Sequence, residues 1–215
     1  MDVDSTFIRE EVIELLAGHA GREAEVAAVT EAAMRGEIDF ADSLRARCRA
    51  LEGLDVGVFE QVYRAVRVTP GADVLLAGLS RRGHAVGLVS GGFVEIVEPL
   101  ARAHGIPHVH ANRLEVVEGR LTGRVDGEIV DRAGKERALR RFAEQEGIPM
   151  SRTVAIGDGA NDLDMMAAAG LGIAFGAKPV VQAQADEVLD GSSLAAVLDL
   201  VEAWADDVND ARGDR

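Results

Sequence analysis

Apolar residues recur every three or four positions through residues 10–66, which is the spacing of one face of an amphipathic helix. Four such runs cover residues 10–21, 22–36, 39–53 and 56–66, and glycines end the first three in the manner of C-terminal helix caps. The pattern therefore predicts four successive helices.

After a break at Thr69-Pro70-Gly71 the pattern changes to short apolar runs that alternate with helical ones. The expected strands are residues 84–90, 153–158, 171–175 and a short one near 187–190, and the expected helices are residues 71–83, 93–105, 134–147, 161–170 and 192–205. Residues 108–131 contain several glycine turns between extended runs, which predicts one or two hairpins.

Strands that alternate with helices are typical of an α/β protein with a doubly wound, parallel, Rossmann-like sheet and short crossovers. Because a first strand at the N-terminus precedes the all-helical stretch, we expect that stretch to be a small cap inserted into the core. The predicted division is a core of residues 1–9 and 69–215 and a helical cap of residues 10–68.

Composition narrows the possible partners and the compartment. The formal net charge of −14 disfavours binding to nucleic acid or to anionic membranes. No apolar run approaches membrane-spanning length, so no membrane partner is expected. The lone Cys48 favours a reducing compartment. We therefore expect a cytoplasmic protein of 215 residues that acts as a monomer or homodimer.

Polar residues gather where the expected strands end, and in such sheets ligands bind at the carboxyl ends of the strands. Asp2 and Asp4 end the first strand. Ser90 ends the second and is followed by Gly91 and Gly92, and Asp158 ends the third and is followed by Asn161 and Asp162. Lys135 begins a helix on the same rim. The pattern predicts a cation site beside an anion site.

The residue types suggest the chemistry of this rim. Carboxylates supply the hard oxygen ligands that Mg²⁺ prefers. Ser90, the free amides of the following glycines and the next helix start suit a phosphate, and Lys135 adds a compact positive charge. A metal ion, a phosphate and a spare carboxylate together indicate phosphoryl transfer through an aspartyl-phosphate.

Four motifs carry a resemblance to a known family. DVDST, VSGGF, Lys135 in AGKERAL and GDGANDLDM resemble, in order and spacing, the motifs of haloacid dehalogenase-type phosphatases. The likeness extends over nearly the whole chain, the helical cap included, and is greatest to the branch of the family that acts on phosphoserine. It implies Mg²⁺-dependent hydrolysis of a phosphomonoester.

The resemblance implies roles for the motif residues. Asp2 would be the nucleophile and Asp4 the general acid and then base, while Mg²⁺ would bind the Asp2 carboxylate, the Asp4 main-chain carbonyl and Asp158. Proton transfer of this kind contributes about 10²–10⁴-fold to a rate. Ser90, Gly91 and Lys135 would hold the phosphate; Asp162 would orient Lys135, and Asn161 would lie at the mouth of the site.

The same resemblance assigns the choice of substrate to the cap. Glu11 would meet the ammonium of phosphoserine, Arg47 its carboxylate, and Phe40 and Met34 would form an apolar cover. Without the motifs, Glu11 would be an ordinary first-turn acid and Arg47 an exposed helix residue. A related small-metabolite phosphatase or phosphotransferase, or a phosphate-binding module with impaired turnover, remains the alternative.

The start of the chain departs from the family pattern. Members of the family have several apolar residues before the first aspartate, whereas only Met1 precedes Asp2. We therefore expect a shortened first strand and a nucleophile with less support than usual, and longer relatives can carry regulatory domains upstream.

Overall fold

The structure is a computed structural model that describes residues 1–34 and 37–213, with the backbone alone described for Met34 and for residues 207–213. The strands are β1 (Gly87–Phe93), β2 (His108–Val117), β3 (Arg120–Asp126), β4 (Val154–Gly157), β5 (Leu171–Phe175) and β6 (Glu187–Leu189). The helices are α1 (Val12–Ala20), α2 (Glu23–Met34), α3 (Phe40–Arg49), α4 (Val58–Ala65), α5 (Ala72–Arg81), α6 (Val94–Ala103), α7 (Arg132–Gln145), α8 (Leu163–Ala168), α9 (Pro179–Gln182) and α10 (Ala195–Gly213).

The strands form two groups of three, ordered β1-β2-β3 and β4-β5-β6. All the pairs are parallel except the β2–β3 hairpin, which is antiparallel. The first residues of the chain join the two groups, because the Asp2 amide donates to the Ile156 carbonyl at 2.9 Å and the Val89 amide donates to the Met1 carbonyl at 3.0 Å. The N-terminal segment thus lies between β1 and β4, as a central strand would.

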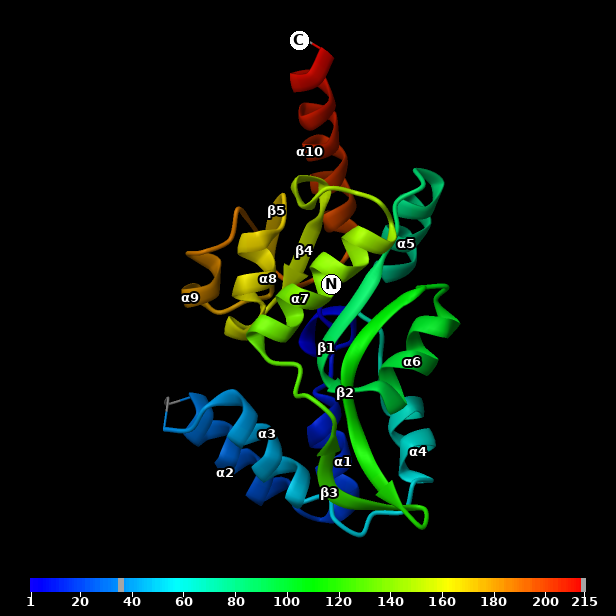
Figure 1. The fold of residues 1–215 in the computed structure, drawn as a ribbon, viewed down its shortest axis with the longest axis vertical. Coiled ribbons are helices and arrows are strands. Elements are labelled where there is room, and N and C mark those ends of the chain that lie inside the picture. The colour runs from blue at the N-terminus through cyan, green and yellow to red at the C-terminus, as the bar shows by residue number, and fades with distance from the viewer. Residues whose placement is uncertain (35–36, 214–215) are drawn as a thin grey trace.

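Helices cover both faces of this sheet (Figure 1). One apolar cluster places Val89 and Ala155 against Phe142 of α7 and Met165 of α8. Neighbouring strand residues point the opposite way, and Leu88 belongs to the larger cluster that includes residues of α5, α6 and α10. The predicted α/β class with a parallel, doubly wound sheet is confirmed.

The four helices expected before residue 69 are present as α1–α4, and α1 illustrates why they form. Its buried residues Val12, Ile13, Leu16 and Ala17 lie on one stripe. Gly21 ends the helix with a φ of 64°, a left-handed conformation that glycine adopts without steric cost. The apolar stripe and the cap thus account for both the position and the end of this helix.

The predicted cap and the predicted core meet through the hairpin. The Gly53 amide donates to the Leu121 carbonyl, and the Leu121 amide donates to the Leu54 carbonyl, so β3 is hydrogen-bonded to the loop after α3. Figure 1 shows α1, α2, α3 and β3 together in its lower half. The boundaries at residues 9/10 and 68/69 stay a prediction.

Three segments differ from expectation. The helix predicted to end at residue 205 continues as α10 to Gly213, and the short helix α9 was not predicted. The N-terminal segment leaves the sheet early: Val3–Phe7 forms a tight turn, η1, in which Ser5 has a φ of 57°. A non-glycine residue in this region is uncommon and marks a constrained turn, directly beside Asp4.

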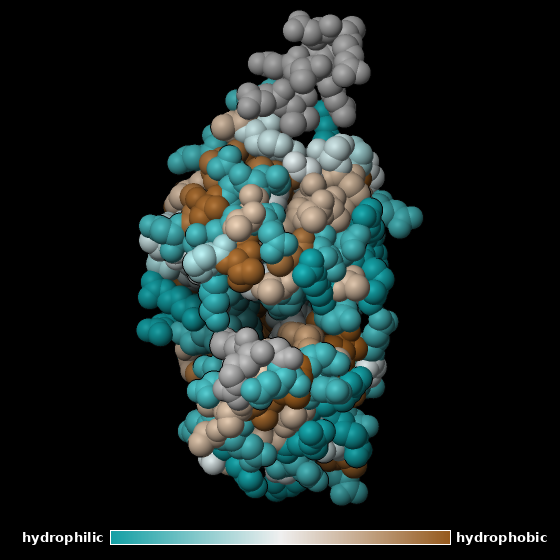
Figure 2. All heavy atoms as spheres, turned by 90° about the vertical axis from the view of Figure 1, so that its left-hand side faces the viewer, coloured by the Kyte–Doolittle hydropathy of each residue, from teal (hydrophilic) through white to brown (hydrophobic). Residues whose placement is uncertain are grey.

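The hydrophilic character of the surface agrees with the acidic composition. Figure 2 shows a face that is mostly hydrophilic, with small scattered hydrophobic spots. Among the described residues, no helix has both the length and the apolar character needed to cross a membrane.

Candidate active site

A cavity of about 170 Å³ lies at the carboxyl ends of the strands that flank the N-terminal segment. Its lining is Asp2, Asp4, Glu11, Ile13, Phe40, Leu44, Arg47, Ser90, Gly91, Gly92, Asp158 and Asn161. A larger cavity elsewhere is predominantly apolar, so the convergence of polar groups identifies the smaller one as the candidate site.

The structure brings most of the predicted site residues to this cavity. Lys135 and Asp162 lie directly behind the cavity. Lys135 contacts Asp162 and also contacts Asp2, which lines the cavity. Met34 is the last residue of α2, and its side chain lies outside the described part of the chain. The role of each of these residues stays a prediction.

The centre of the site is a buried triad of charges. Lys135 is fully buried, and its Nζ donates to Asp2 Oδ1 and to Asp162 Oδ1, at 2.7 Å each. Burial disfavours the charged amine, but the charges of Asp162 and Asp2 outweigh this effect and raise the pKa of Lys135. The lysine is therefore a permanent cation held between two carboxylates.

Local structure explains why Lys135 points there. The Asp131 side chain accepts a hydrogen bond from the Gly134 amide at 2.7 Å and so caps the N-terminus of α7. This cap fixes the first turn, in which Lys135 lies. On the other side, Asp162 Oδ2 accepts from the Gly159 amide, which holds the loop after β4.

The carboxylates of the site could hold a metal ion. Asp2, Asp158 and Asp162 each bring a carboxylate oxygen to within 4.8 Å of the others. Burial and the neighbouring charge of Asp162 raise the pKa of Asp2 to about 7 and that of Asp158 to about 6. A divalent cation would relieve this repulsion, so the donor set fits a hard metal ion. This cluster contains Asp162, which was expected to orient Lys135, and does not contain the Asp4 side chain; the predicted ligand set of Asp2, the Asp4 main-chain carbonyl and Asp158 stays a prediction.

Asp4 is suited to carry a proton. Its Oδ2 accepts from the Val12 amide at 3.1 Å, while its Oδ1 is buried with no hydrogen-bond partner among the described residues. Burial, with the charges of Glu11 and Asp2, raises the pKa of Asp4 well above the usual range of a carboxyl. Oδ1 is thus the oxygen that is free to give and take a proton at the cavity.

The loop after Ser90 forms a close cradle. The buried Ser90 Oγ accepts from the Gly92 amide at 2.8 Å. A Cβ on Gly91 would lie 2.9 Å from Phe40 Cζ, and one on Gly92 would lie 3.3 Å from both carboxylate oxygens of Asp4. Only glycine allows the backbone to approach this closely. The result is a narrow space beside Ser90 and two glycines.

Glu11 and Arg47 form a second pair of charges in the cavity. Glu11 and Arg47 are both half-buried, and burial raises the pKa of Glu11 and lowers that of Arg47. Ser5 Oγ donates to Glu11 Oε1 at 2.7 Å, which fixes the carboxylate. The left-handed turn at Ser5 makes this contact possible.

Sequence reasoning missed several contributors. Ile13 and Leu44 line the cavity, Thr6 Oγ1 donates to Asp158 Oδ1 at 3.1 Å, and Ser5 holds Glu11 as described. Asn112 donates to the Gly91 carbonyl and accepts from the Val130 amide, both at 2.8 Å. A lone asparagine inside an expected strand was the available signal for the last of these.

Comparison with known proteins defines the class. The family model of haloacid dehalogenase-like hydrolases matches residues 1–167, and the chain belongs to that family. A phosphoserine phosphatase of Streptomyces coelicolor is 56% identical over 99% of this chain, and this chain covers 54% of its length. A phosphoserine phosphatase of Streptococcus thermophilus is 49% identical over 94% of both chains.

The solved structures agree. A phospho-aspartyl intermediate analogue of phosphoserine phosphatase superposes with a TM-score of 0.87, at 40% identity, over 93% of this chain and 95% of that one. The chain spans about half the length of the Streptomyces coelicolor relative and nearly the whole of the Streptococcus thermophilus one.

Proposed function

We propose that this chain hydrolyses O-phospho-L-serine to L-serine and phosphate, the step that completes serine biosynthesis, with Mg²⁺ as cofactor. One observation carries the proposal. A cavity of only about 170 Å³ has a phosphate-binding and carboxylate end at the sheet and a Glu11–Arg47 end at the cap. A small zwitterionic phosphomonoester has complementary groups at both ends. The high identity to phosphoserine phosphatases supports this assignment.

The covalent step follows from the positions of two carboxylates. Lys135 neutralises charge at Asp2, so that a carboxylate oxygen of Asp2 attacks phosphorus and the bond to the serine oxygen breaks. Asp4 Oδ1 gives its proton to the departing serine oxygen. The product of this half-reaction is an aspartyl-phosphate on Asp2.

Hydrolysis reverses the proton transfer. Asp4, now a carboxylate, takes a proton from water, whose oxygen attacks phosphorus, and the bond to Asp2 breaks to release phosphate. Asp2, Asp158 and the Asp4 main-chain carbonyl would hold Mg²⁺, which would supply charge stabilisation for the transferring phosphoryl group. Ser90 and the glycines that follow it line the cavity and would bind the same group from the other side.

The cap residues would select the amino acid. Arg47 presents a planar fork that matches a carboxylate, and Glu11, fixed by Ser5, faces the ammonium. Phe40 closes the space above Gly91. We place the reaction in the cytoplasm, where Cys48, a buried free thiol, stays reduced. A monomer or homodimer that binds neither nucleic acid nor membrane completes the proposal.

The test compares two substrates. Arg47→Ala and Glu11→Gln should lower kcat/KM for phosphoserine by roughly ten- to a hundredfold, because a hydrogen bond to a charged group is worth about 1.5–3 kcal/mol. They should barely change kcat/KM for para-nitrophenyl phosphate, which has neither group. Arg45→Ala and Glu14→Gln, exposed residues on the same two helices, are matched controls.

Three results would contradict the assignment. Equal losses on both substrates would mean that Glu11 and Arg47 only support the fold. Turnover of phosphothreonine or phosphoethanolamine as fast as of phosphoserine would favour a phosphatase of broader range. If the wild-type chain with Mg²⁺ turned over no phosphomonoester at all, a phosphate-binding module would be the better description.

A further inference from the structure

Strand β1 leaves its partner β2 at the point where the candidate active site begins. Ser90 and Phe93 pair with two consecutive residues of β2, so Gly91 and Gly92 between them have no partner in the ladder. Both glycines line the cavity. A bulge of this kind redirects a strand and leaves backbone groups unpaired. The position of this loop must therefore be fixed by contacts other than those of the sheet.

Asn112 of β2, the partner of Phe93, lies at this break and is only 1% exposed. Its Nδ2 donates to the Gly91 carbonyl at 2.8 Å, and its Oδ1 accepts from the Val130 amide at 2.8 Å. A flipped amide would place donor against donor and acceptor against acceptor, so the two contacts determine its orientation. One planar group thus joins the loop after Ser90 to the segment before α7.

The second contact of Asn112 leads to Lys135. Val130 is buried and directly precedes Asp131, whose side chain caps α7 through the Gly134 amide. The Lys135 amide donates to the Asp131 carbonyl at 2.9 Å, so Lys135 belongs to the first turn of the capped helix. Asn112 therefore holds the residue beside the cap, and the cap holds the turn that carries the lysine.

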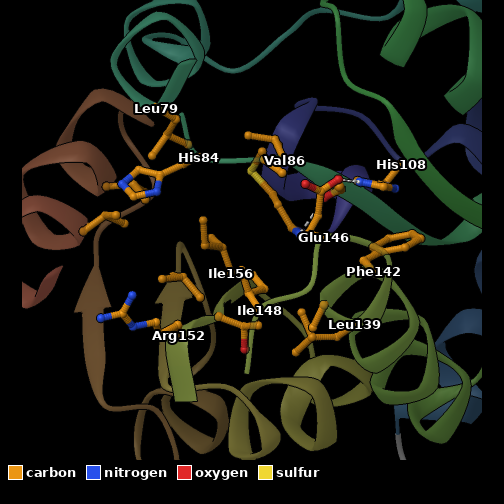
Figure 3. A pocket seen from close by; sticks show the side chains of 18 of the residues that line it. Leu79, His84, Val86, His108, Leu139, Phe142, Glu146, Ile148, Arg152 and Ile156 are labelled. Carbon is orange, nitrogen blue, oxygen red and sulfur yellow. Dashed lines mark hydrogen bonds and ion pairs between the residues drawn. The ribbon is translucent and has the colours of Figure 1, made fainter. Parts of the chain in front are cut away.

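The later turns of α7 are held by apolar packing instead. Figure 3 shows Leu139 and Phe142 of α7 pointing into the larger, apolar cavity. Phe142 lies so close to β1 that a Cβ on Gly87 would be 2.7 Å from its ring. Apolar packing is non-directional, so it keeps α7 on the sheet without fixing its first turn relative to the loop after Ser90. The two hydrogen bonds of Asn112 supply that direction.

We propose that Asn112 is a positioning residue for the phosphoryl end of the site, which holds the loop after Ser90 in place relative to Lys135. The proposal rests on the proposed function, in which that loop and Lys135 bind the transferring phosphate. Asn112 is not among the described residues that line the cavity, so it acts through Gly91 and Val130 rather than on the substrate.

The two contacts together require an amide. A carboxylate of the same shape accepts from the Val130 amide but has no proton to donate to the Gly91 carbonyl, and an apolar side chain does neither. A buried polar group without its partner is costly, so the loop should shift when Asn112 is replaced. A shift of about 1 Å in a positioned group can lower a rate 10²-fold.

The experiment compares Asn112→Asp and Asn112→Leu with the wild type, with Mg²⁺ present and well below the melting temperature of each protein. Calorimetry measures the dissociation constant of inorganic phosphate, and kinetics give kcat/KM for phosphoserine and for para-nitrophenyl phosphate. We expect about tenfold weaker phosphate binding or more, and a loss of roughly 10- to 100-fold in kcat/KM. The loss should be equal for both substrates, because both carry the same phosphoryl group, whereas Arg47→Ala should discriminate between them.

Thr153→Val is the control that separates positioning from stability. Thr153 is 5% exposed, and its Oγ1 donates to the Met150 carbonyl at 2.7 Å, at the opposite end of β4 from Asp158. This substitution also removes a buried hydrogen bond, so it should lower the melting temperature while phosphate binding and kcat/KM stay unchanged. If the Asn112 variants behave in the same way, Asn112 only supports the fold and the proposal is overturned.

Two further outcomes are informative. A loss confined to phosphoserine would place the effect at the amino-acid end of the cavity and would also overturn the proposal. If the wild type binds phosphate but does not turn over phosphoserine, the proposed function fails, while the phosphate titration still tests Asn112. Circular dichroism shows whether each variant folds. Because one variant adds a charge and the other an apolar group, a folding failure of one leaves the other as the test.

Discussion

Replacement of Lys135 by methionine tests the charged centre of the site directly. Methionine keeps the length and the apolar stem of the side chain but removes the ammonium. In the native protein Nζ is fully buried and donates to Asp2 and Asp162 at 2.7 Å. The substitution therefore leaves two buried carboxylates side by side with no cation between them.

The expected magnitude follows from this geometry. Removing one partner of a buried ion pair costs about 3–5 kcal/mol of unfolding free energy. In a domain of this size about 1 kcal/mol changes the melting temperature by roughly 2–4 °C, so Lys135→Met should lower it by about 6–20 °C. The pKa of Asp2, already raised to about 7 by burial and by Asp162, should rise further, because Lys135 lowers it. Less of the nucleophile is then ionised at neutral pH.

The assay combines thermal melting with the pH profile of phosphoserine hydrolysis, with and without Mg²⁺. Lys178→Met is the matched control, since Lys178 is exposed and surface charge contacts are worth about 0–1 kcal/mol. Activity of Lys135→Met should be lower throughout, with its acidic limb moved to higher pH. A melting temperature within about 3 °C of the control, or an unmoved acidic limb, would refute the assignment of Lys135 as the cation that holds Asp2.

Asp4→Asn should lower kcat for phosphoserine by about 10²–10⁴-fold. It should melt no lower than the wild type, because it replaces a buried carboxyl by a neutral amide. A kcat within tenfold of the wild-type value would contradict the role of Asp4 as the acid. Gly92→Ala places a methyl group 3.3 Å from both Asp4 carboxylate oxygens. The KM for any phosphomonoester should therefore rise, while circular dichroism shows an unchanged fold. An unchanged KM would mean that the loop shifts to accommodate the methyl group. Between about pH 4 and 6 the native Asp2 and Asp158 retain protons that the unfolded chain has lost. The unfolding free energy of the metal-free protein should therefore fall as the pH rises. Urea titrations that show the opposite slope would contradict this prediction. Above pH 6 the buried Met1 amine, whose pKa is lowered by burial to about 6, opposes this trend, and added Mg²⁺ should flatten it.

The sequence alone determined the local elements and the kind of chemistry. Helical spacing and glycine caps predicted α1–α4, and alternation with strands predicted the parallel sheet that the structure has. These signals depend on residues within a few positions of one another, and a single chain carries them in full. The order of the four motifs could also be read from the sequence, because the motifs are short patterns placed relative to the ends of predicted strands.

Only the tertiary structure decided which groups touch. Lys135 meets Asp2 across 133 positions of sequence, and Thr6 meets Asp158 across 152. Such contacts follow from the order of the strands and from which face each side chain takes, and neither is encoded in a local pattern. The same holds for the turn at Ser5, whose left-handed backbone is fixed by packing around it.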